Sequence, residues 1–142
     1  MSDASSIRPD LPRTFWQALL RGARSRCPRC GEGQLFRRWL KPVDRCAACT
    51  LDLTPQRADD LPAYIAIIVT GHLLAPVMIA LSATVGLSVT TILAIIIPLS
   101  MAMLLAMIQP AKGGVIATQW WHGMNGFLRQ RSVETPPARN RA

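Results

Sequence analysis

Four cysteines carry the clearest chemical signal in the sequence, because they come as two closely spaced pairs. Cys27 and Cys30 enclose two residues, and after fifteen further residues Cys46 and Cys49 repeat the arrangement. A two-residue gap lets both thiolates of a turn point at one centre, and two such pairs supply four sulfur ligands at about 2.3 Å from a tetrahedral Zn²⁺. The spacing therefore predicts a zinc-ribbon-like module that binds Zn²⁺ through these four residues.

A zinc site closed by four sulfur atoms is expected to be structural. It leaves no open position for water or substrate, so we expect no catalysis at the metal. Thiol–disulfide chemistry and transient copper handling are the alternatives for the same cysteines. Four thiolates leave the site negatively charged, and basic residues surround the motif to offset that charge. These residues are Arg24, Arg26, Arg29, Arg37, Arg38 and Arg45.

His72 and Met101 form a possible second site inside the apolar part of the chain. About ten residues into a helix that rises about 1.5 Å per residue, His72 is expected near the bilayer midplane. If the chain turns back near Gly86, Met101 lies at the same depth, and His with Met could bind copper. The simpler interpretation is an imidazole hydrogen-bonded to a carbonyl or hydroxyl across the hairpin. By the same depth argument, Gly71 is expected at a close helix contact.

The distribution of charge predicts two transmembrane helices that position these residues. Residues 61 to 111 contain no Lys, Arg, Asp or Glu, although the whole chain has a net charge of +8. This run is much longer than the roughly 20 residues that one spanning helix needs. We expect helices over about 62–83 and 89–109, joined by a turn at 84–88. Asp60 and Pro62 are typical of the start of the first helix.

Basic residues predict how this hairpin is oriented. Eleven Lys and Arg precede the first predicted span, five follow the second, and the turn between them has none. Because basic flanks stay on the cytoplasmic side, both termini are expected there. The expected fold class is thus a membrane all-α protein, a two-helix transmembrane hairpin with a small N-terminal zinc-ribbon-like head and a C-terminal interfacial segment.

Outside the two spans, the sequence divides into four further segments. Residues 1–13 are expected to be a flexible N-terminus, and residues 14–58 a basic amphipathic helix followed by the cysteine module. That helix could lie on anionic lipid or pack on the module. Within the module, residues 34–40 are expected to form a strand, closed by a turn at 41–42. Residues 112–128, with Trp120 and Trp121, are expected at headgroup depth, and 129–142 as a disordered tail.

Several of these motifs together resemble a bacterial family called domain of unknown function 983. They are the run from Arg26 to Phe36, the second cysteine pair, the segment from Ala58 to Ala63, Lys112-Gly113 and Gln119-Trp120. The resemblance covers roughly residues 14 to 127 and implies a cysteine-rich head with two helices in the bacterial inner membrane. It also implies a neighbourhood with respiratory oxidase assembly genes. Thr50 departs from the family pattern, in which glycine is expected after the second pair.

Together these features favour a non-enzymatic protein that works with a partner. The sequence contains no Ser/His/Asp set and no phosphate-binding loop, so an enzyme is not expected. We expect an accessory or assembly factor, whose zinc head docks a membrane protein complex, such as a respiratory oxidase, and whose hairpin contacts the lipid bilayer. A membrane-anchored nucleic-acid-binding ribbon is the less favoured alternative, using basic and aromatic residues of the head. A copper-handling protein that uses His72 and Met101 is another.

Overall fold

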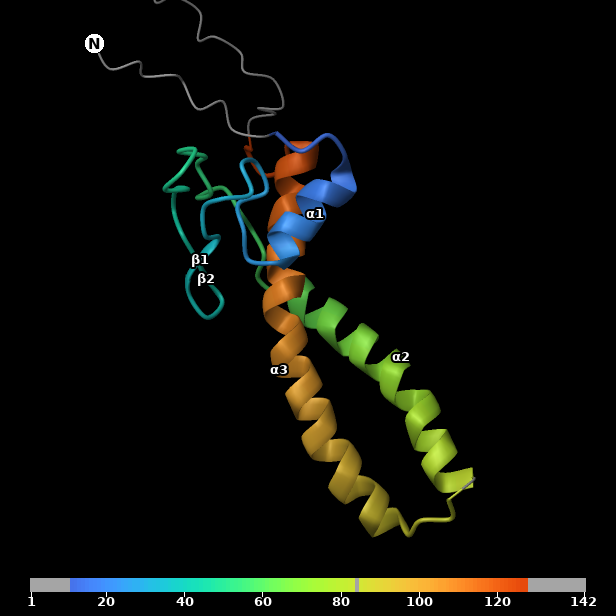
Figure 1. Cartoon of the computed structure of the whole chain (residues 1–142). Coiled ribbons are helices and arrows are strands. Elements are labelled where there is room, and N and C mark those ends of the chain that lie inside the picture. The colour runs from blue at the N-terminus through green and yellow to red at the C-terminus, as the bar shows by residue number, and fades with distance from the viewer. Residues whose placement is uncertain (1–10, 84, 128–142) are drawn as a thin grey trace, which may run out of the picture.

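The structure, a computed structural model, consists of a small head attached to a long helical hairpin (Figure 1). It describes residues 11–83 and 85–127, so most of the predicted flexible N-terminus and the whole predicted tail at 129–142 lie outside the described residues. Three helices and one short antiparallel hairpin follow in chain order. They are α1 (Phe15–Ala23), β1 (Phe36–Arg38), β2 (Lys41–Pro42), α2 (Leu61–Ala83) and α3 (Val89–His122).

The two long helices begin where the sequence predicts. The Asp60 carbonyl accepts hydrogen bonds from the backbone N–H groups of Ala63 and Tyr64, so α2 starts one residue before the expected position. α3 starts at Val89, where the Ser88 hydroxyl caps the first turn by accepting from the Thr91 N–H at 3.3 Å. Both helices are long and apolar enough to cross a membrane. The two apolar helices expected from the charge pattern are thus present.

The second long helix does not end near residue 109. It continues without interruption to His122, giving 34 residues where about 21 were expected, and ends at Gly123 in the left-handed conformation. At about 1.5 Å per residue, α3 is roughly 51 Å long, compared with a hydrocarbon thickness of about 30 Å. The segment from 112 onward is therefore a helical extension that leads into the head (Figure 1).

α2 packs on α3 along a stripe with four-residue spacing. Its buried residues are Pro62, Ala66, Thr70 and Leu74. The expected close contact at Gly71 is wrong, because a side chain added there would meet no atom within 4 Å. One residue along a helix turns the side chain by about 100°, so a stripe displaced by one position faces another direction. Near the head, the two helices enclose an apolar cavity of about 200 Å³ lined by residues such as Ala63, Ile67 and Ile108.

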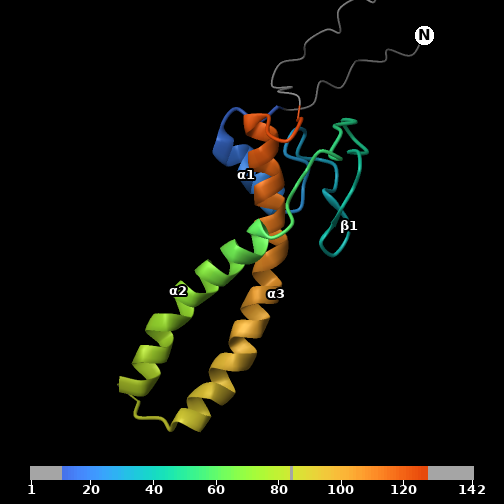
Figure 2. The same cartoon turned by 180° about the vertical axis from the view of Figure 1, so that it is seen from behind.

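The head is built around the end of α3. Figures 1 and 2 show α1 on one side of this helix end and the hairpin β1–β2 on the other. Trp120 has only 2% of its surface exposed, so it lies inside the head. The headgroup depth expected for 112–128 stays a prediction. A head this small cannot bury enough apolar surface by itself, and the uncharged end of α3 supplies the rest. The buried core comprises Ala18, Cys27, Cys30, Leu35, Phe36, Cys46, Leu51, Leu53, Ala58, Val115, Ile116, Trp120 and Phe127.

The amphipathic helix α1 uses its narrow face to cross α3. The Thr14 hydroxyl caps α1 by accepting from the Gln17 N–H at 3.3 Å. Ala18 and Gly22 are buried against α3, and a Cβ atom on Gly22 would overlap the carbonyl oxygen of Gly113. A Cβ on Gly113 would likewise overlap the carbonyl of Gly22. The α1 helix therefore packs on α3. The sequence analysis had considered anionic lipid and the cysteine module as its partners, but not α3.

The short hairpin of the head is shifted from the predicted strand. Phe36 pairs with Pro42 and Arg38 with Lys41, so the chain turns at Trp39 and not at 41–42. Leu40 has a φ of 62°, and a tight turn accommodates this left-handed conformation. Phe36 is buried, whereas Arg37 and Arg38 are exposed. The hairpin consequently presents basic side chains outward.

The glycine crossing yields a first prediction. Gly113→Ala should lower the free energy of unfolding by about 1–3 kcal/mol, because a methyl group there forces α1 away from α3. Gly71→Ala is the matched control, since it also replaces a helical glycine but meets open space. That variant should be neutral or stabilise by about 0.5–1 kcal/mol. Thermal unfolding in mild detergent measures both, and equal effects of the two variants would contradict the crossing.

Candidate metal centre

The structure brings the four cysteines of the sequence motif together. Their sulfur atoms all lie within 4.8 Å of one another, and the thiols are free. Cys27 Sγ is 3.7 Å from Cys49 Sγ, and Cys30 Sγ is 3.7 Å from Cys46 Sγ. Tetrahedral corners at about 2.3 Å from a zinc ion are about 3.8 Å apart, whereas a disulfide requires about 2.05 Å. The arrangement is thus suited to one metal ion with four sulfur ligands.

Each cysteine pair sits in the same kind of backbone turn. The Gly31 N–H donates to the Cys27 carbonyl at 2.9 Å, and the Thr50 N–H donates to the Cys46 carbonyl at 2.9 Å. The residue after each pair is left-handed, with φ of 74° at Gly31 and 57° at Thr50. These matching turns aim both sulfur atoms of a pair toward the same centre, as the two-residue spacing predicts.

The departure at Thr50 therefore falls on a position where glycine has a physical advantage. A left-handed conformation costs a residue with a Cβ atom roughly 1–2 kcal/mol, and β-branched residues are especially rare there. The Thr50 hydroxyl donates to the Cys49 carbonyl at 2.7 Å, which offsets part of this cost. The turn forms despite the substitution because the surrounding hydrogen bonds fix its backbone.

Backbone hydrogen bonds hold the two turns beside each other. The Cys27 N–H donates to the Gly33 carbonyl at 2.8 Å, and the Cys46 N–H donates to the Leu51 carbonyl at 3.0 Å. Gly33 also allows the second pair to approach the first, because a Cβ atom there would overlap the Cys46 sulfur. Glycine at this position is thus a requirement of close approach between the two halves of the site.

Proton sharing makes the four thiols unequal. Cys27 and Cys49 share a hydrogen bond between their sulfur atoms, and this bond lowers the pKa of Cys49 to about 5. The same bond, together with burial, raises the pKa of Cys27 above its usual range. Burial is the main cause that raises the pKa of Cys46. Without metal, these shifts favour the thiolate at Cys49 and the protonated thiol at Cys27 and Cys46.

One arginine of the predicted basic cluster reaches the centre. The Arg29 guanidinium donates to the Cys49 carbonyl at 3.3 Å, across the site from its own cysteine pair. The Arg29 carbonyl in turn accepts from the Arg21 guanidinium at 3.0 Å, which links the site to α1. Arg24, Arg26, Arg37, Arg38 and Arg45 are exposed. Of the six predicted arginines, Arg29 is the one that contacts the frame of the site and can offset its charge directly.

Gln119 is a structural residue of the site that sequence reasoning missed. Its side-chain oxygen accepts from the Arg57 N–H at 3.0 Å, and its amide nitrogen donates to the Arg57 carbonyl. Gln119 is 7% exposed, so these bonds are made in the interior. They fix the segment between the cysteine module and α2 against α3. The sequence feature that could have pointed to this role of Gln119 is its position directly before a tryptophan at the end of an apolar run.

His72 and Met101 are both exposed on the long helices, and a copper site formed by them stays a prediction. The His72 Nδ1 atom lies 2.8 Å from the carbonyl oxygen of Ile68, one turn earlier on its own helix. The expected partner across the hairpin is thus replaced by a partner within α2. Met101 has 56% of its surface exposed on α3. Ser82 and Ser100 make the same kind of bond to their own helices, so backbone carbonyls satisfy all three polar side chains.

Comparisons with known proteins give one family. The family model described as "Protein of unknown function (DUF983)" matches residues 36–120. The matched region contains the second cysteine pair, both long helices up to Trp120, and the segment between them; it begins after the first cysteine pair. No curated protein and no solved structure matches the chain.

The protons held by Cys27 and Cys46 predict how metal affinity depends on pH. Binding of a divalent ion such as Zn²⁺ must displace protons from at least Cys27 and Cys46, so acid weakens binding and base strengthens it. Two released protons correspond to a change of about 100-fold in apparent affinity per pH unit near neutrality. Competition with a chromophoric chelator at several pH values measures this slope. An affinity that does not vary with pH would contradict protonated Cys27 and Cys46.

The strained turn gives a further prediction. Thr50→Gly should raise the free energy of unfolding by roughly 0.5–1 kcal/mol, because removing the Cβ relieves more strain than the added freedom of the unfolded chain costs. Ala48→Gly is the control in the same turn, where φ is not positive. It should destabilise by roughly 0.5–1 kcal/mol. Thermal unfolding of the metal-loaded protein measures both, and destabilisation by Thr50→Gly would show that the hydroxyl bond outweighs the strain.

Proposed function

The chain belongs to the DUF983 family of proteins of unknown function, and we propose that it is a non-enzymatic accessory protein of a membrane complex. In this proposal, α2 and α3 cross the bilayer, and one Zn²⁺ ion stabilises the head as a rigid docking platform. The observation that carries the proposal is a shared core. Cys27, Cys46 and Trp120 belong to one buried cluster, so the metal centre shares its hydrophobic core with a candidate transmembrane helix.

The donor set supports zinc as the metal. Four thiolates in a tetrahedral arrangement suit Zn²⁺ or iron–sulfur chemistry, and zinc fills a closed shell of this size with a single ion. Zn²⁺ has no redox chemistry, and a shell of four sulfur ligands has no place for a substrate. Binding energies of about 10–16 kcal/mol for structural zinc are large enough to determine whether a small head folds. Zinc would thus act as a structural element of the platform.

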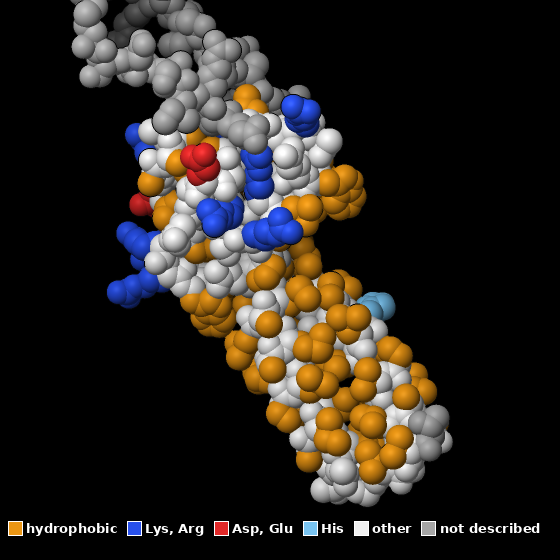
Figure 3. All heavy atoms as spheres, in the orientation of Figure 1, with side chains coloured by type: hydrophobic (Ala, Val, Ile, Leu, Met, Phe, Trp, Pro, Cys, Tyr) orange, Lys and Arg blue, Asp and Glu red, His pale blue; other side chains and the backbone are white. Residues whose placement is uncertain are grey.

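The exposure of the long helices supports membrane insertion. In the most apolar stretches of α2 and α3, only 11% and 6% of the residues are buried. A core helix of a soluble protein would be mostly covered by its own chain, whereas Figure 3 shows apolar side chains over the visible face of this hairpin. Such a surface requires lipid or protein around it. The basic residues gathered on the head favour the cytoplasmic side of a bacterial inner membrane for the head.

The outer face of α1 supports a docking role. Trp16 is 68% exposed and Leu20 is 51% exposed, while the opposite face of the same helix is fixed on α3. Exposed aromatic and aliphatic residues on a rigid element are typical of protein contacts, and aromatic residues often dominate their binding energy. A membrane complex such as a respiratory oxidase, which the family resemblance suggests, would offer both a cytoplasmic surface and helices to accompany the hairpin.

One purification from membranes tests the proposal. In mild detergent, the wild-type chain is expected to carry one zinc ion and to co-purify with one membrane complex, read by elemental analysis and protein identification. Cys46→Ser should lose both the zinc and the partner, because the head unfolds without metal. Trp16→Ser combined with Leu20→Ser should keep the zinc and lose the partner. An iron–sulfur absorption spectrum, or disulfides in place of metal, would refute the zinc centre.

Trp39→Ser is the matched control. It also removes an exposed tryptophan, 57% exposed, but from the hairpin on the other side of α3. This variant should keep both the zinc and the partner. Equal loss of the partner in both tryptophan variants would mean that docking does not depend on α1. Extraction of the wild-type protein by alkaline buffer without detergent would refute membrane insertion.

A further inference from the structure

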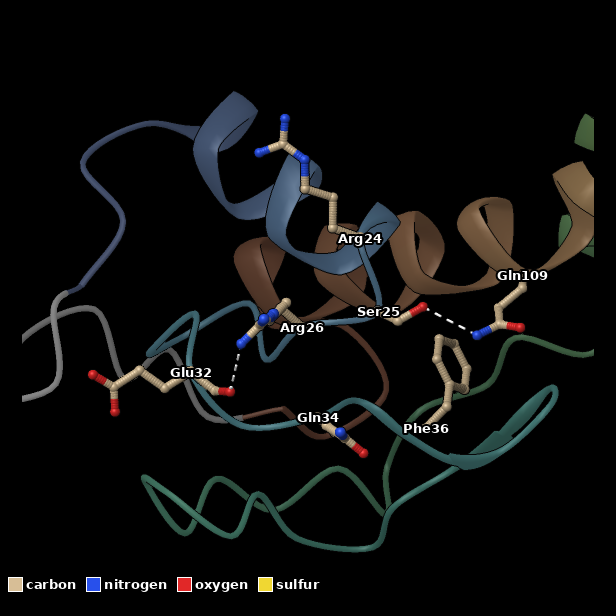
Figure 4. Close-up of a pocket in the computed structure, with 7 residues that line it drawn as sticks. All are labelled: Arg24, Ser25, Arg26, Glu32, Gln34, Phe36 and Gln109. Atoms are coloured by element: carbon tan, nitrogen blue, oxygen red, sulfur yellow. Dashed lines mark hydrogen bonds between the residues drawn. The ribbon is translucent and has the colours of Figure 1, made fainter.

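A polar pocket lies where the head meets the long helices. Its volume is about 340 Å³, at the lower end of the range for small-ligand sites. Figure 4 shows that its walls come from the turn after α1, from the β1 side of the head and from α3, where Gln109 contributes the amide. Phe36 closes it on the side of the hairpin. Residues between 24 and 36 and Gln109, at least 73 positions further along the chain, thus line one space.

Ser25 holds these walls together. Its hydroxyl accepts from the Gln109 side chain at 3.1 Å, its N–H donates to the Gly22 carbonyl at 2.9 Å, and its carbonyl accepts from the Leu35 N–H at 2.9 Å. Ser25 has a φ of 61°, a strained conformation of the kind that often occurs at binding sites. The hydroxyl hydrogen stays available to an acceptor in the pocket. The wall around Ser25 is therefore formed before any ligand arrives.

The lining supplies donors of hydrogen bonds and positive charge. Arg26 uses one N–H to donate to the Glu32 carbonyl at 3.2 Å and keeps further N–H groups. Arg24 and Gln34 are exposed parts of the same lining. In Figure 4 the Glu32 carboxylate points away from Arg26. Within residues 11–83 and 85–127, no carboxylate pairs with Arg24 or Arg26. Two arginines, an amide and a hydroxyl are groups that commonly bind phosphate.

The position of the pocket points to the source of the phosphate. Gln109 lies three residues before Lys112, the first charged residue after the uncharged run that begins at residue 61. The pocket therefore lies at the boundary between the apolar hairpin and the basic head, where the phosphates of a bilayer lie. Beside it, the hairpin β1–β2 carries Trp39 with exposed basic neighbours. Tryptophan and basic residues are enriched at this depth.

We propose that this pocket binds the phosphate group of an anionic phospholipid, such as phosphatidylglycerol. Arg26 and Arg24 would neutralise the phosphate, the Ser25 hydroxyl and the Gln34 amide would donate to its oxygen atoms, and the acyl chains would extend along the apolar surface below Gln109. The lipid would thus connect α1, the cysteine module and α3 at one point. The inference rests on the proposed insertion of the hairpin into a membrane.

Lipid retention tests this pocket. The protein is reconstituted with equal amounts of phosphatidylglycerol and phosphatidylcholine, released into mild detergent, and weighed by native mass spectrometry. Wild type is expected to retain one phosphatidylglycerol. Arg24→Gln combined with Arg26→Gln should reduce retention about tenfold or more, since each charge-assisted hydrogen bond to the phosphate contributes about a factor of ten. Gln34→Glu should also reduce it, because a carboxylate repels phosphate.

The hairpin supplies the control. Arg37→Gln combined with Arg38→Gln removes the same charge from exposed positions outside the pocket and should leave retention within about twofold of wild type. Equal loss in both double variants, or full retention in the pocket variants, would overturn the inference. Displacement of the lipid by inorganic phosphate at comparable concentration would assign the pocket to soluble phosphate and would also overturn it. Zinc content verifies a folded head, and resistance to alkaline extraction tests membrane insertion separately.

Discussion

The packing of the head on the end of α3 is the constraint on which the other features depend. The carbonyl groups of Gly22 and Gly113 occupy the space that side chains would need, so α1 and α3 cross with their backbones in direct contact. This close approach brings the turn after α1 to the side of α3, where Ser25 reaches Gln109. Trp120 fills the head from the same helix. A helix that is long and apolar enough to cross a membrane thus serves as the central element of the head.

The four-cysteine centre and this helix stabilise each other. The cysteine module contributes apolar residues such as Leu35 and Leu53 to the core, and the extension of α3 adds Val115, Ile116 and Trp120. Metal binding closes the module around its sulfur atoms, and Gln119 fixes the following segment by two hydrogen bonds to Arg57. Loss of the metal would therefore change the packing at the point where the long helices enter the head. This coupling gives a physical basis for a platform whose shape depends on metal.

Particular residues show how far sequence reasoning reached. The convergence of the two cysteine pairs and the starts of both long helices follow from short-range rules, and each agrees with the structure. The predicted end of the second helix was wrong. The charge at Lys112 marks a change of surroundings, but a charged residue does not stop a helix. The contact expected at Gly71 was also wrong, since the apolar residues around it allow several helix faces to pack. Uniform apolar sequence specifies a span but not its packing direction.

The sequence by itself determined the local chemistry: four sulfur ligands in two turns, two long apolar helices and basic flanks. These features depend on neighbours a few positions apart, which the order of residues specifies directly. The tertiary structure alone decided that α3 extends into the head, that two glycines form the crossing, and that a polar pocket opens between Ser25 and Gln109. Such contacts join residues as much as 91 positions apart, as at Gly22 and Gly113. They exist because a small head buries enough apolar surface only by folding around the extension of α3.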